Sequence, residues 1–481
     1  MAQSVATGFM STADEHTSSQ PSVPLAWTPL SGRTTTLVAC LVVAGYILTF
    51  TYAATAPAIL VALPALCVLA RQRNAWQAFG VGLLVGTLIN VVLLAFILQV
   101  VGWIAAPLWV VGALPIAVFV LLRHVAERAL RPTWAIVWTP VLWTGIEYFR
   151  SEIWSLRFAW LLPGQAAAFL PGVRLNALGV YAVGFIYMSL AALAVAPIKK
   201  LRVVGVAGLL ISAILMYWPP LPPTPSSATI QVAGLQVERW DETEVAAALD
   251  QLALAHPEAQ LLVLNECAFS ESVPEEVRDV IRKHQRYLIA GGSVPIEGDQ
   301  FYNTAFVIGP DGTDVFSQAK SMPVQFLNDG VPAPERRVWD SPWGKIGIAI
   351  CYDASYSRVM DDFVRQGACG LILPTMDVTS WGEFERRMLH GRVQPVRSAE
   401  YGIPTFGVWS SGISQLTDCH GRVIATAGYP GQGDTITGPF DLSRPGHIPP
   451  DRLPAQLAMF ATAAFAAYSL LSQLWRAWTK S

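Results

Sequence analysis

The sequence predicts a helical membrane domain of about eight transmembrane (TM) spans joined to a soluble α/β domain. Of its 481 residues, 53% are hydrophobic and only 14% are charged, whereas soluble domains average about 25% charged residues. Between residues 34 and 122 the only charged side chains are Arg71 and Arg73. Beyond residue 228, short apolar runs alternate with polar helical stretches, which is typical of an α/β domain.

Apolar segments predict the spans, because a helix needs roughly 20 apolar residues to cross about 30 Å of hydrocarbon. Seven segments fall within a membrane domain at 34–218, and the eighth stands alone at 453–475. The fifth is short and ends at Glu147 and Arg150. The expected spans are 35–53, 54–70, 76–101, 104–122, 133–146, 175–198, 202–218 and 453–474.

Basic residues predict the orientation, since short loops rich in Lys and Arg stay cytoplasmic. With eight spans, the clusters at 71–73, 123–131, 199–202 and 476–480 all fall on one side. An inside N-terminus then places the segment between the seventh and eighth spans on the outer face of the membrane. Residues 1–33 are polar and lack the apolar segment of a signal peptide, so we expect a disordered cytoplasmic tail.

Charges and aromatic residues on the outer side have a simple interpretation in this topology. We expect the charges there to be solvated in loops and the aromatic side chains to lie at the membrane interface. The residues concerned are Glu147, Arg150, Glu152, Arg157 and Arg174, and Trp160, Tyr217 and Trp218.

The soluble domain is predicted at 228–445, after a Pro-rich linker at 219–227 that cannot continue a helix. Helical patterns cover 242–255 and 275–284. The runs expected to form strands are 228–237, 261–264, 287–290, 304–308, 346–350, 370–373 and 405–408.

Three residues at the ends of strand-like runs could carry chemistry. Glu266 follows a buried run, Lys320 ends the stretch 315–319, and Cys351 follows 345–350. The ends of strands are where α/β sheets keep their sites. A carboxylate could take the thiol proton, the thiolate could attack an acyl carbonyl, and the ammonium could stabilise the oxyanion. Cys267, next to the expected base, is interpreted as a packing residue.

Glu266, Lys320 and Cys351, in this order and these contexts, resemble the Glu-Lys-Cys triad of the nitrilase, or carbon-nitrogen hydrolase, superfamily. Such a domain after about seven spans and before one more resembles one family, the apolipoprotein N-acyltransferases. The resemblance implies a four-layer αββα sandwich. Shorter stretches that also resemble the family are 146–150, 159–165, 240–241, 381–382 and 397–400.

The resemblance suggests supporting residues and also shows departures. Leu264-Asn265-Glu266 stands where the family usually has Trp-Pro-Glu, and 323–332 and 374–377 also differ from the family pattern. Asp329 corresponds to a family Glu that assists the site, with one residue inserted. The remaining candidates for substrate binding or support are Tyr352, Asp353, Trp240 and Trp381.

The implied reaction is a ping-pong transfer of an acyl chain from a membrane phospholipid, through a thioester on Cys351, to the N-terminal amine of a diacylglyceryl-cysteine apolipoprotein. Glu266 would take the proton of the thiol and later that of the amine. The implied location is the bacterial inner membrane, with the catalytic domain on the periplasmic face. We expect a monomer that needs neither a cofactor nor a metal, since the histidines show no ligand spacing.

Other functions stay open at this point. The nearest is a membrane-tethered nitrilase-type amidase or hydrolase, in which water resolves the thioester. A non-catalytic lipid-binding or lipoprotein-binding protein is the next. A transporter is disfavoured because the expected spans contain no buried acid-base pair. The net charge of −2 gives no support for nucleic-acid binding.

Overall fold

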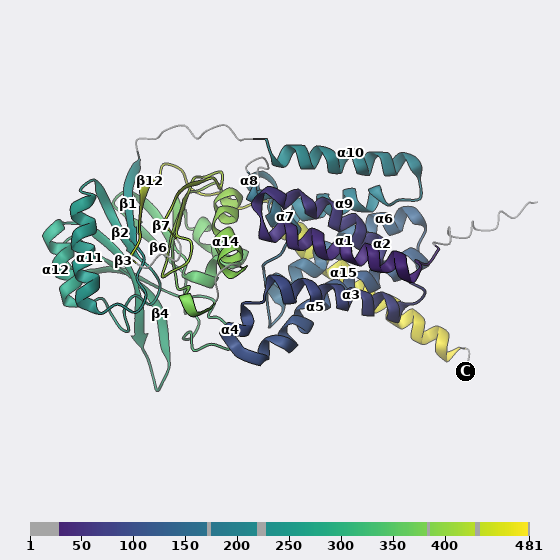
Figure 1. Cartoon of the computed structure of the whole chain (residues 1–481), viewed down its shortest axis with the longest axis horizontal. Helices are drawn as coiled ribbons and strands as arrows, with labels where there is room; N and C mark the ends of the chain where they lie inside the picture. Colours follow the sequence, from purple (N-terminus) through teal and green to yellow (C-terminus); the bar gives the residue numbers. More distant parts are fainter. Residues whose placement is uncertain (1–27, 171–174, 219–227, 382–384, 429–432, 480–481) are drawn as a thin grey trace, which may run out of the picture.

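A computed structural model describes residues 28–170, 175–218, 228–381, 385–428 and 433–479. It places a helical half beside a sandwich of two β-sheets (Figure 1). The predicted linker and most of the predicted N-terminal tail lie outside the described residues.

Helices occur at each of the eight positions predicted for spans. The helical elements of this half are α1 (Gly32–Thr51), η1 (Ala53–Ala58), α2 (Ile59–Leu69), α3 (Ala75–Leu93), α4 (Ile97–Val101), η2 (Gly102–Ile104), α5 (Ala105–Ala129), α6 (Pro132–Tyr148), η3 (Phe149–Ile153), α7 (Pro163–Ala166), η4 (Ala167–Phe169), α8 (Leu175–Leu178), α9 (Val180–Ala194), α10 (Lys199–Met216) and α15 (Arg452–Trp478).

Among the described residues, four helical segments are long and apolar enough to cross a membrane. They are Gly32–Thr51, Ala75–Leu93, Ile97–Ala129 and Arg452–Trp475. Two shorter apolar helical segments, Ala53–Leu69 and Val180–Ala194, fall below this length. The multi-helix membrane character is therefore supported, and the number of eight spans stays a prediction.

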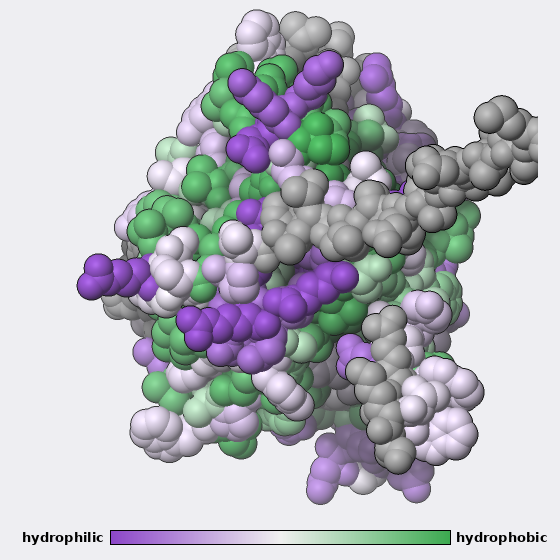
Figure 2. Space-filling view, turned by 90° about the vertical axis from the view of Figure 1, so that its right-hand side faces the viewer, coloured by the Kyte–Doolittle hydropathy of each residue, from purple (hydrophilic) through white to green (hydrophobic). Residues whose placement is uncertain are grey.

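The basic loops of the helical half meet at one end. Arg128 donates to the carbonyl oxygen of Arg73 (2.9 Å), and Arg71 donates to that of Val195 (2.8 Å). Helix α1 begins and α15 ends at the extremity away from the sandwich (Figure 1). Viewed from that side, hydrophilic side chains lie among apolar ones (Figure 2). Their placement agrees with the sidedness predicted from the basic clusters.

One expectation for this region is wrong. Helix α5 continues to Ala129, so Arg123 lies in a helix and not in a loop. It is buried, donates to the carbonyl oxygen of Cys67 (2.9 Å) and pairs with Glu127 (2.8 Å). A buried acid-base pair is therefore present near the end of this span. The i,i+4 spacing brings Arg123 and Glu127 together, and the carbonyl oxygen of Cys67 in α2 gives Arg123 a further partner.

Twelve strands among the described residues form two six-stranded sheets, in the orders β12-β1-β2-β3-β4-β5 and β11-β10-β9-β8-β7-β6. All the runs expected to be strands are strands. The strands are β1 (Thr229–Leu235), β2 (Ala259–Leu264), β3 (Tyr287–Pro295), β4 (Phe301–Ile308), β5 (Asp314–Ala319), β6 (Val338–Ser341), β7 (Gly344–Ile348), β8 (Gly370–Thr375), β9 (Thr405–Trp409), β10 (Gln415–Thr417), β11 (Val423–Thr426) and β12 (Thr435–Asp441).

The central strands are parallel and therefore end at the same edge of each sheet. Strand β1 pairs in parallel with β2, and β2 with β3; in the second sheet β7, β8 and β9 are likewise parallel. Apolar side chains such as Val232 and Ile348 fill the space between the sheets. Because the two sheets pack face to face, the residues that follow β2 and β7 lie near one another.

Helices cover both outer faces and complete an αββα sandwich (Figure 1). Helices α11 (Glu242–Ala255) and α12 (Glu275–His284) pack on the first sheet, and α11 begins with a capping box between Asp241 and Glu244. Helices α13 (Ser357–Arg365) and α14 (Glu385–Tyr401) lie beside the second sheet.

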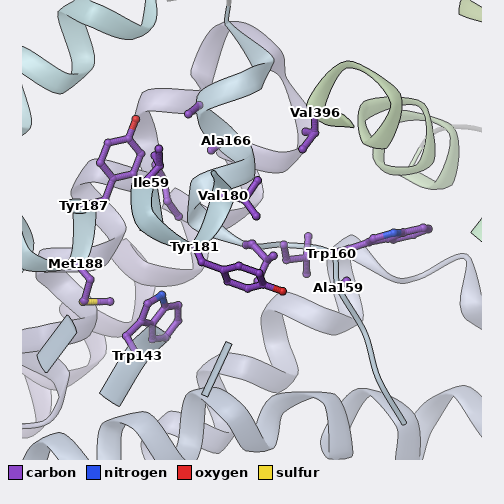
Figure 3. Packing of buried hydrophobic residues seen from close by; sticks show 14 of the residues in the cluster. Ile59, Trp143, Ala159, Trp160, Ala166, Val180, Tyr181, Tyr187, Met188 and Val396 are labelled. Atoms are coloured by element: carbon purple, nitrogen blue, oxygen red, sulfur yellow. The ribbon is translucent and has the colours of Figure 1, made fainter. Parts of the chain in front are cut away.

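The second helical layer belongs to both halves of the molecule. Val396 of α14 lies in the same apolar cluster as Trp160, Tyr181 and Met188 of the helical half (Figure 3). Arg392 of α14 donates to the carbonyl oxygen of Phe50 (2.8 Å) and to that of Thr51 (2.7 Å) at the end of α1. A cation is favourable there because these carbonyl groups have no partner within the helix.

A buried charge network anchors α15 to the sandwich and gives the first prediction. Arg452 pairs with Asp361 (3.1 Å), Glu400 (2.9 Å) and Asp451 (2.8 Å). We expect Arg452→Met to lower the unfolding free energy by about 3 kcal/mol, because it leaves buried carboxylates without their cation. The measurement is denaturant unfolding of the purified protein in detergent.

The matched control is Arg282→Met, which removes an exposed arginine paired with Asp279 and Glu275 on α12. This change should lower the unfolding free energy far less than Arg452→Met does, because an ion pair at the surface is screened by water. Equal losses for the two variants would contradict the anchoring role of Arg452.

Candidate active site

A cavity of about 430 Å³ lies where the sandwich meets the helical half. Glu266, Lys320 and Cys351 all line it, as the strand-end argument predicted. The rest of its wall is mainly apolar and includes residues of several membrane helices. Among these are Ile89, Asn90, Val111, Gly112, Pro115 and Ile146. The cavity therefore connects three chemically capable side chains with the interior of the helical half.

Lys320 and Glu266 form an ion pair in the wall of this cavity. Lys320 Nζ lies 2.7 Å from Glu266 Oε1, and each side chain is only 1% exposed. Burial alone would lower the pKa of Lys320, but the negative charges of Glu266 and Asp329 help raise this pKa well above its ordinary value. Lys320 is therefore a permanent ammonium group.

Two further side chains fix this pair. Asp329 Oδ2 lies 2.6 Å from Lys320 Nζ and accepts a hydrogen bond from the backbone N–H of Val324 (2.7 Å). Asn303 Nδ2, on β4, lies 2.7 Å from Glu266 Oε1 and 2.8 Å from Asp329 Oδ1. Asp329 is thus placed at the site as predicted. Asn303 was missed, because a lone Asn within a strand run gives no signal in a single sequence.

Glu266 is held by a third donor from the other sheet. Its Oε2 accepts a hydrogen bond from the backbone N–H of Met376 (2.7 Å), one residue after β8. Both carboxylate oxygens therefore have fixed partners, and the carboxylate has a defined orientation. The adjacent Cys267 has a positive φ of 52° and is exposed, so the expectation that it packs in the core is wrong.

Cys351 lies on a tight turn directly beyond β7. Its φ of 51° is unusual for a residue with a side chain, and it begins the short helix η5 (Cys351–Ser355). Such strain persists where the surroundings impose it and is common at active sites. Burial and the negative charge of Glu266 raise the pKa of the Cys351 thiol well above its ordinary value, while Lys320 opposes this. The resting sulfur is therefore protonated.

Asp353 has a structural place close to this turn. Its carboxylate accepts hydrogen bonds from the backbone N–H groups of Met322 (2.7 Å), Ser321 (3.0 Å) and Ile350 (3.2 Å). Burial raises the pKa of Asp353 to about 6 in spite of these bonds. Asp353 thus joins the nucleophile turn to the segment that follows Lys320, and it is not one of the residues that line the cavity.

Of the three remaining candidates, two line the cavity and one does not. Tyr352 and Trp381 line the cavity. Trp240 does not, and it packs beside the core under α11. Sequence reasoning placed it early in the domain, but it lies between the end of β1 and the start of α11 and not in the cavity wall.

Several outer-side residues contradict the solvated-loop expectation. Glu147 (2% exposed) and Arg150 line the cavity, and Glu152 is also buried. Trp160 is 7% exposed, lines the cavity and donates to Ser355 Oγ (2.8 Å), so it is not an interfacial residue. The sandwich covers Glu152 and Trp160, which contact Ser357 and Ser355, whereas Glu147 is buried among the membrane helices beside Gly184 of α9. Neither kind of burial could be inferred from the spans alone. Arg174 lies outside the described residues.

No group of three or more His, Cys, Asp or Glu side chains in the described part of the chain could hold a metal ion. The side chains around the cavity include a protonated thiol, an oriented carboxylate and a buried ammonium.

Two protein families match this chain. Residues 211–449 match the carbon-nitrogen hydrolase family, and residues 44–193 match the N-terminal domain of apolipoprotein N-acyltransferase. The two matches follow one another along the chain and correspond to the sandwich and to most of the helical half.

Similar proteins include members of both kinds. An apolipoprotein N-acyltransferase of Geobacter metallireducens is 25% identical over 363 residues, which cover 64% of this chain and 68% of that protein. Omega-amidase NIT2-B of Xenopus laevis is 28% identical over 224 residues, covering 38% of this chain and 77% of that protein. Among solved structures, a carbon-nitrogen hydrolase of Helicobacter pylori G27 aligns with 18% identity and a TM-score of 0.39, covering 45% of this chain and 90% of that one.

The match to the Geobacter protein covers 64% of this chain and is therefore longer than the sandwich. The match to the Xenopus omega-amidase covers only 38% of it. A helical half of this type, followed by a nitrilase-like sandwich, is the combination that the two family matches describe. The chain belongs to the apolipoprotein N-acyltransferase family of the nitrilase superfamily.

Proposed function

We propose that this protein transfers an acyl chain from a membrane phospholipid, through a thioester on Cys351, to the N-terminal amine of diacylglyceryl-cysteine apolipoproteins. The observation that carries the proposal is the shared cavity, in which Cys351, Glu266 and Lys320 lie on one wall and membrane-helix residues on another. A water-soluble substrate would not need such a wall, whereas a fatty chain gains from burial in it.

The residues divide the acylation step among them. Glu266 accepts the proton of Cys351, and the thiolate attacks the ester carbonyl of the lipid. The ammonium of Lys320 stabilises the negative oxygen of the tetrahedral intermediate, since it carries its charge before the reaction begins. The lysophospholipid leaves, and an amine then attacks the thioester. Asn303 and Asp329 support the site by fixing Glu266 and Lys320.

The position of the cavity also supports a topology. It lies at the end of the helical half opposite the basic loops. If those loops are cytoplasmic, the sandwich is on the periplasmic face of the inner membrane. Donor lipid and lipidated acceptor would then both reach Cys351 from the bilayer.

Trapping the intermediate tests the nucleophile. The intact protein incubated with phospholipid should gain one acyl mass that hydroxylamine removes and that maps to Cys351. Cys351→Ala should abolish this adduct, because it removes the sulfur that would form the thioester. Cys369→Ala, at a half-buried cysteine away from the cavity, is the matched control and should keep the adduct. An unchanged adduct in Cys351→Ala would remove this residue from the reaction.

Replacing Glu266 should change the pKa of Cys351 and the rate of acyl transfer in separately measurable ways. Glu266→Gln keeps the shape but removes the charge that helps raise the pKa of Cys351. The thiolate should then form at lower pH, so the pH profile of iodoacetamide alkylation at Cys351 should move to lower pH. Acyl transfer should fall by about 10² to 10⁴. An alkylation profile at the same pH, or one displaced upward, would contradict this electrostatic account.

Water as the acceptor would make the protein a hydrolase instead. Mass spectrometry of a lipoprotein incubated with the protein and phospholipid decides between them. We expect a new acyl amide on the lipoprotein N-terminus. Release of free fatty acid without that amide would favour the hydrolase.

A further inference from the structure

His390 contacts the reactive sulfur and has no role in the reaction so far. It lies on α14, is 5% exposed and lines the same cavity. Its Nε2 is 4.0 Å from Cys351 Sγ. Glu266 comes from the first sheet, whereas α14 lies between the second sheet and the helical half (Figure 1). The sulfur is therefore contacted by an acid-base group from the side of the membrane helices.

Three side chains surround the ring of His390. Asp377 Oδ1 lies 3.8 Å from His390 Nδ1, and Asp377 is buried just beyond β8. The rings of Trp160 and Trp409 lie with their centroids 5.5 Å and 5.9 Å from that of His390. The carboxylate and the two rings hold the imidazole with Nε2 toward Cys351. Trp160 extends from the helical half on the side of α14 (Figure 3).

The chemistry needs a proton that Glu266 is badly placed to deliver. An ester that loses lysophospholipid expels an alkoxide, which is a poor leaving group unless it is protonated as the bond breaks. Both oxygens of Glu266 are already held by Lys320, Asn303 and the N–H of Met376. His390 lines the cavity shared with the membrane helices, so it can reach the glycerol part of a lipid that enters between them.

We infer that His390 is the general acid-base that protonates the departing lysophospholipid oxygen and later accepts the proton of the attacking amine. The inference rests on the proposed acyl transfer. In acylation, Cys351 Sγ gives its proton to Glu266 and bonds to the carbonyl carbon, the ester C–O bond breaks, and His390 Nε2 gives its proton to that oxygen.

The second half of the reaction restores both groups. The amine nitrogen bonds to the carbonyl carbon and passes one proton to His390, while the C–S bond breaks and Glu266 returns its proton to the sulfur. The cycle then begins again with a protonated imidazole, a carboxylate and a thiol. In this cycle His390 accepts the proton of the amine, whereas the family resemblance implies that Glu266 accepts it.

A purely structural role for His390, such as orienting Trp160, predicts a different outcome. Loss of an orienting ring would slow every acyl donor alike, because it would disturb the shared cavity. Loss of a general acid slows only donors whose leaving group needs a proton. A p-nitrophenyl ester expels a stable phenolate and does not need one.

The test compares two donors with the same palmitoyl chain, dipalmitoyl phosphatidylethanolamine and p-nitrophenyl palmitate, on the full-length protein in detergent. The single-turnover rate of acyl-Cys351 formation is followed by mass spectrometry. His390→Phe and His390→Gln should each lose about 10²- to 10³-fold with the phospholipid and stay within about threefold of the unmodified protein with the nitrophenyl ester. The retained nitrophenyl rate also shows that the variants are folded.

His284→Phe is the matched control, since His284 also lies beside an aspartate, Asp250 (2.7 Å), but on α12. It should react normally with both donors. Equal losses with both donors in the His390 variants, or no loss with either, would overturn the inference. An unmodified protein that is acylated by the nitrophenyl ester but never by the phospholipid would overturn the proposed function, and the inference with it.

Discussion

The buried ion pair between Lys320 and Glu266 constrains the whole site. Taking two charges out of water costs several kcal/mol for each ion, so a pair that is 1% exposed persists only with further partners in good geometry. Those partners are Asn303 on β4, Asp329 after the lysine and the N–H of Met376 beyond β8. Asn303 belongs to the first sheet and Met376 follows a strand of the second, so the ion pair links the two sheets at the edge that carries the site.

The interface with the helical half depends on a second set of buried charges. Arg392 satisfies carbonyl groups at the end of α1, and Arg452 connects the start of α15 with Asp361 and Glu400 of the sandwich. These contacts hold α13 and α14 against the membrane helices. As a result, the cavity has one wall with Cys351 and a second, mainly apolar wall from the helices.

Most of the fold and the three central residues could be predicted because they follow local rules. Short apolar runs marked the central strands, and the ends of these strands located Glu266 and Cys351. Asn303 and His390 were missed, since one lies within a strand, the other on a helix, and only tertiary packing brings them to the site. Glu147, Glu152 and Trp160 were misplaced for the same reason: packing among the membrane helices buries Glu147, and the sandwich covers Glu152 and Trp160.

The central claim is that a fatty chain lies between α3, α5 and the sulfur of Cys351. The most direct measurement is photocrosslinking with a phospholipid that carries a diazirine at the end of its acyl chain, followed by peptide mass spectrometry. Crosslinks should concentrate on cavity-lining positions such as Asn90 and Gly112. Crosslinks confined to the outward faces of α10 and α15, with none at the cavity, would contradict the account.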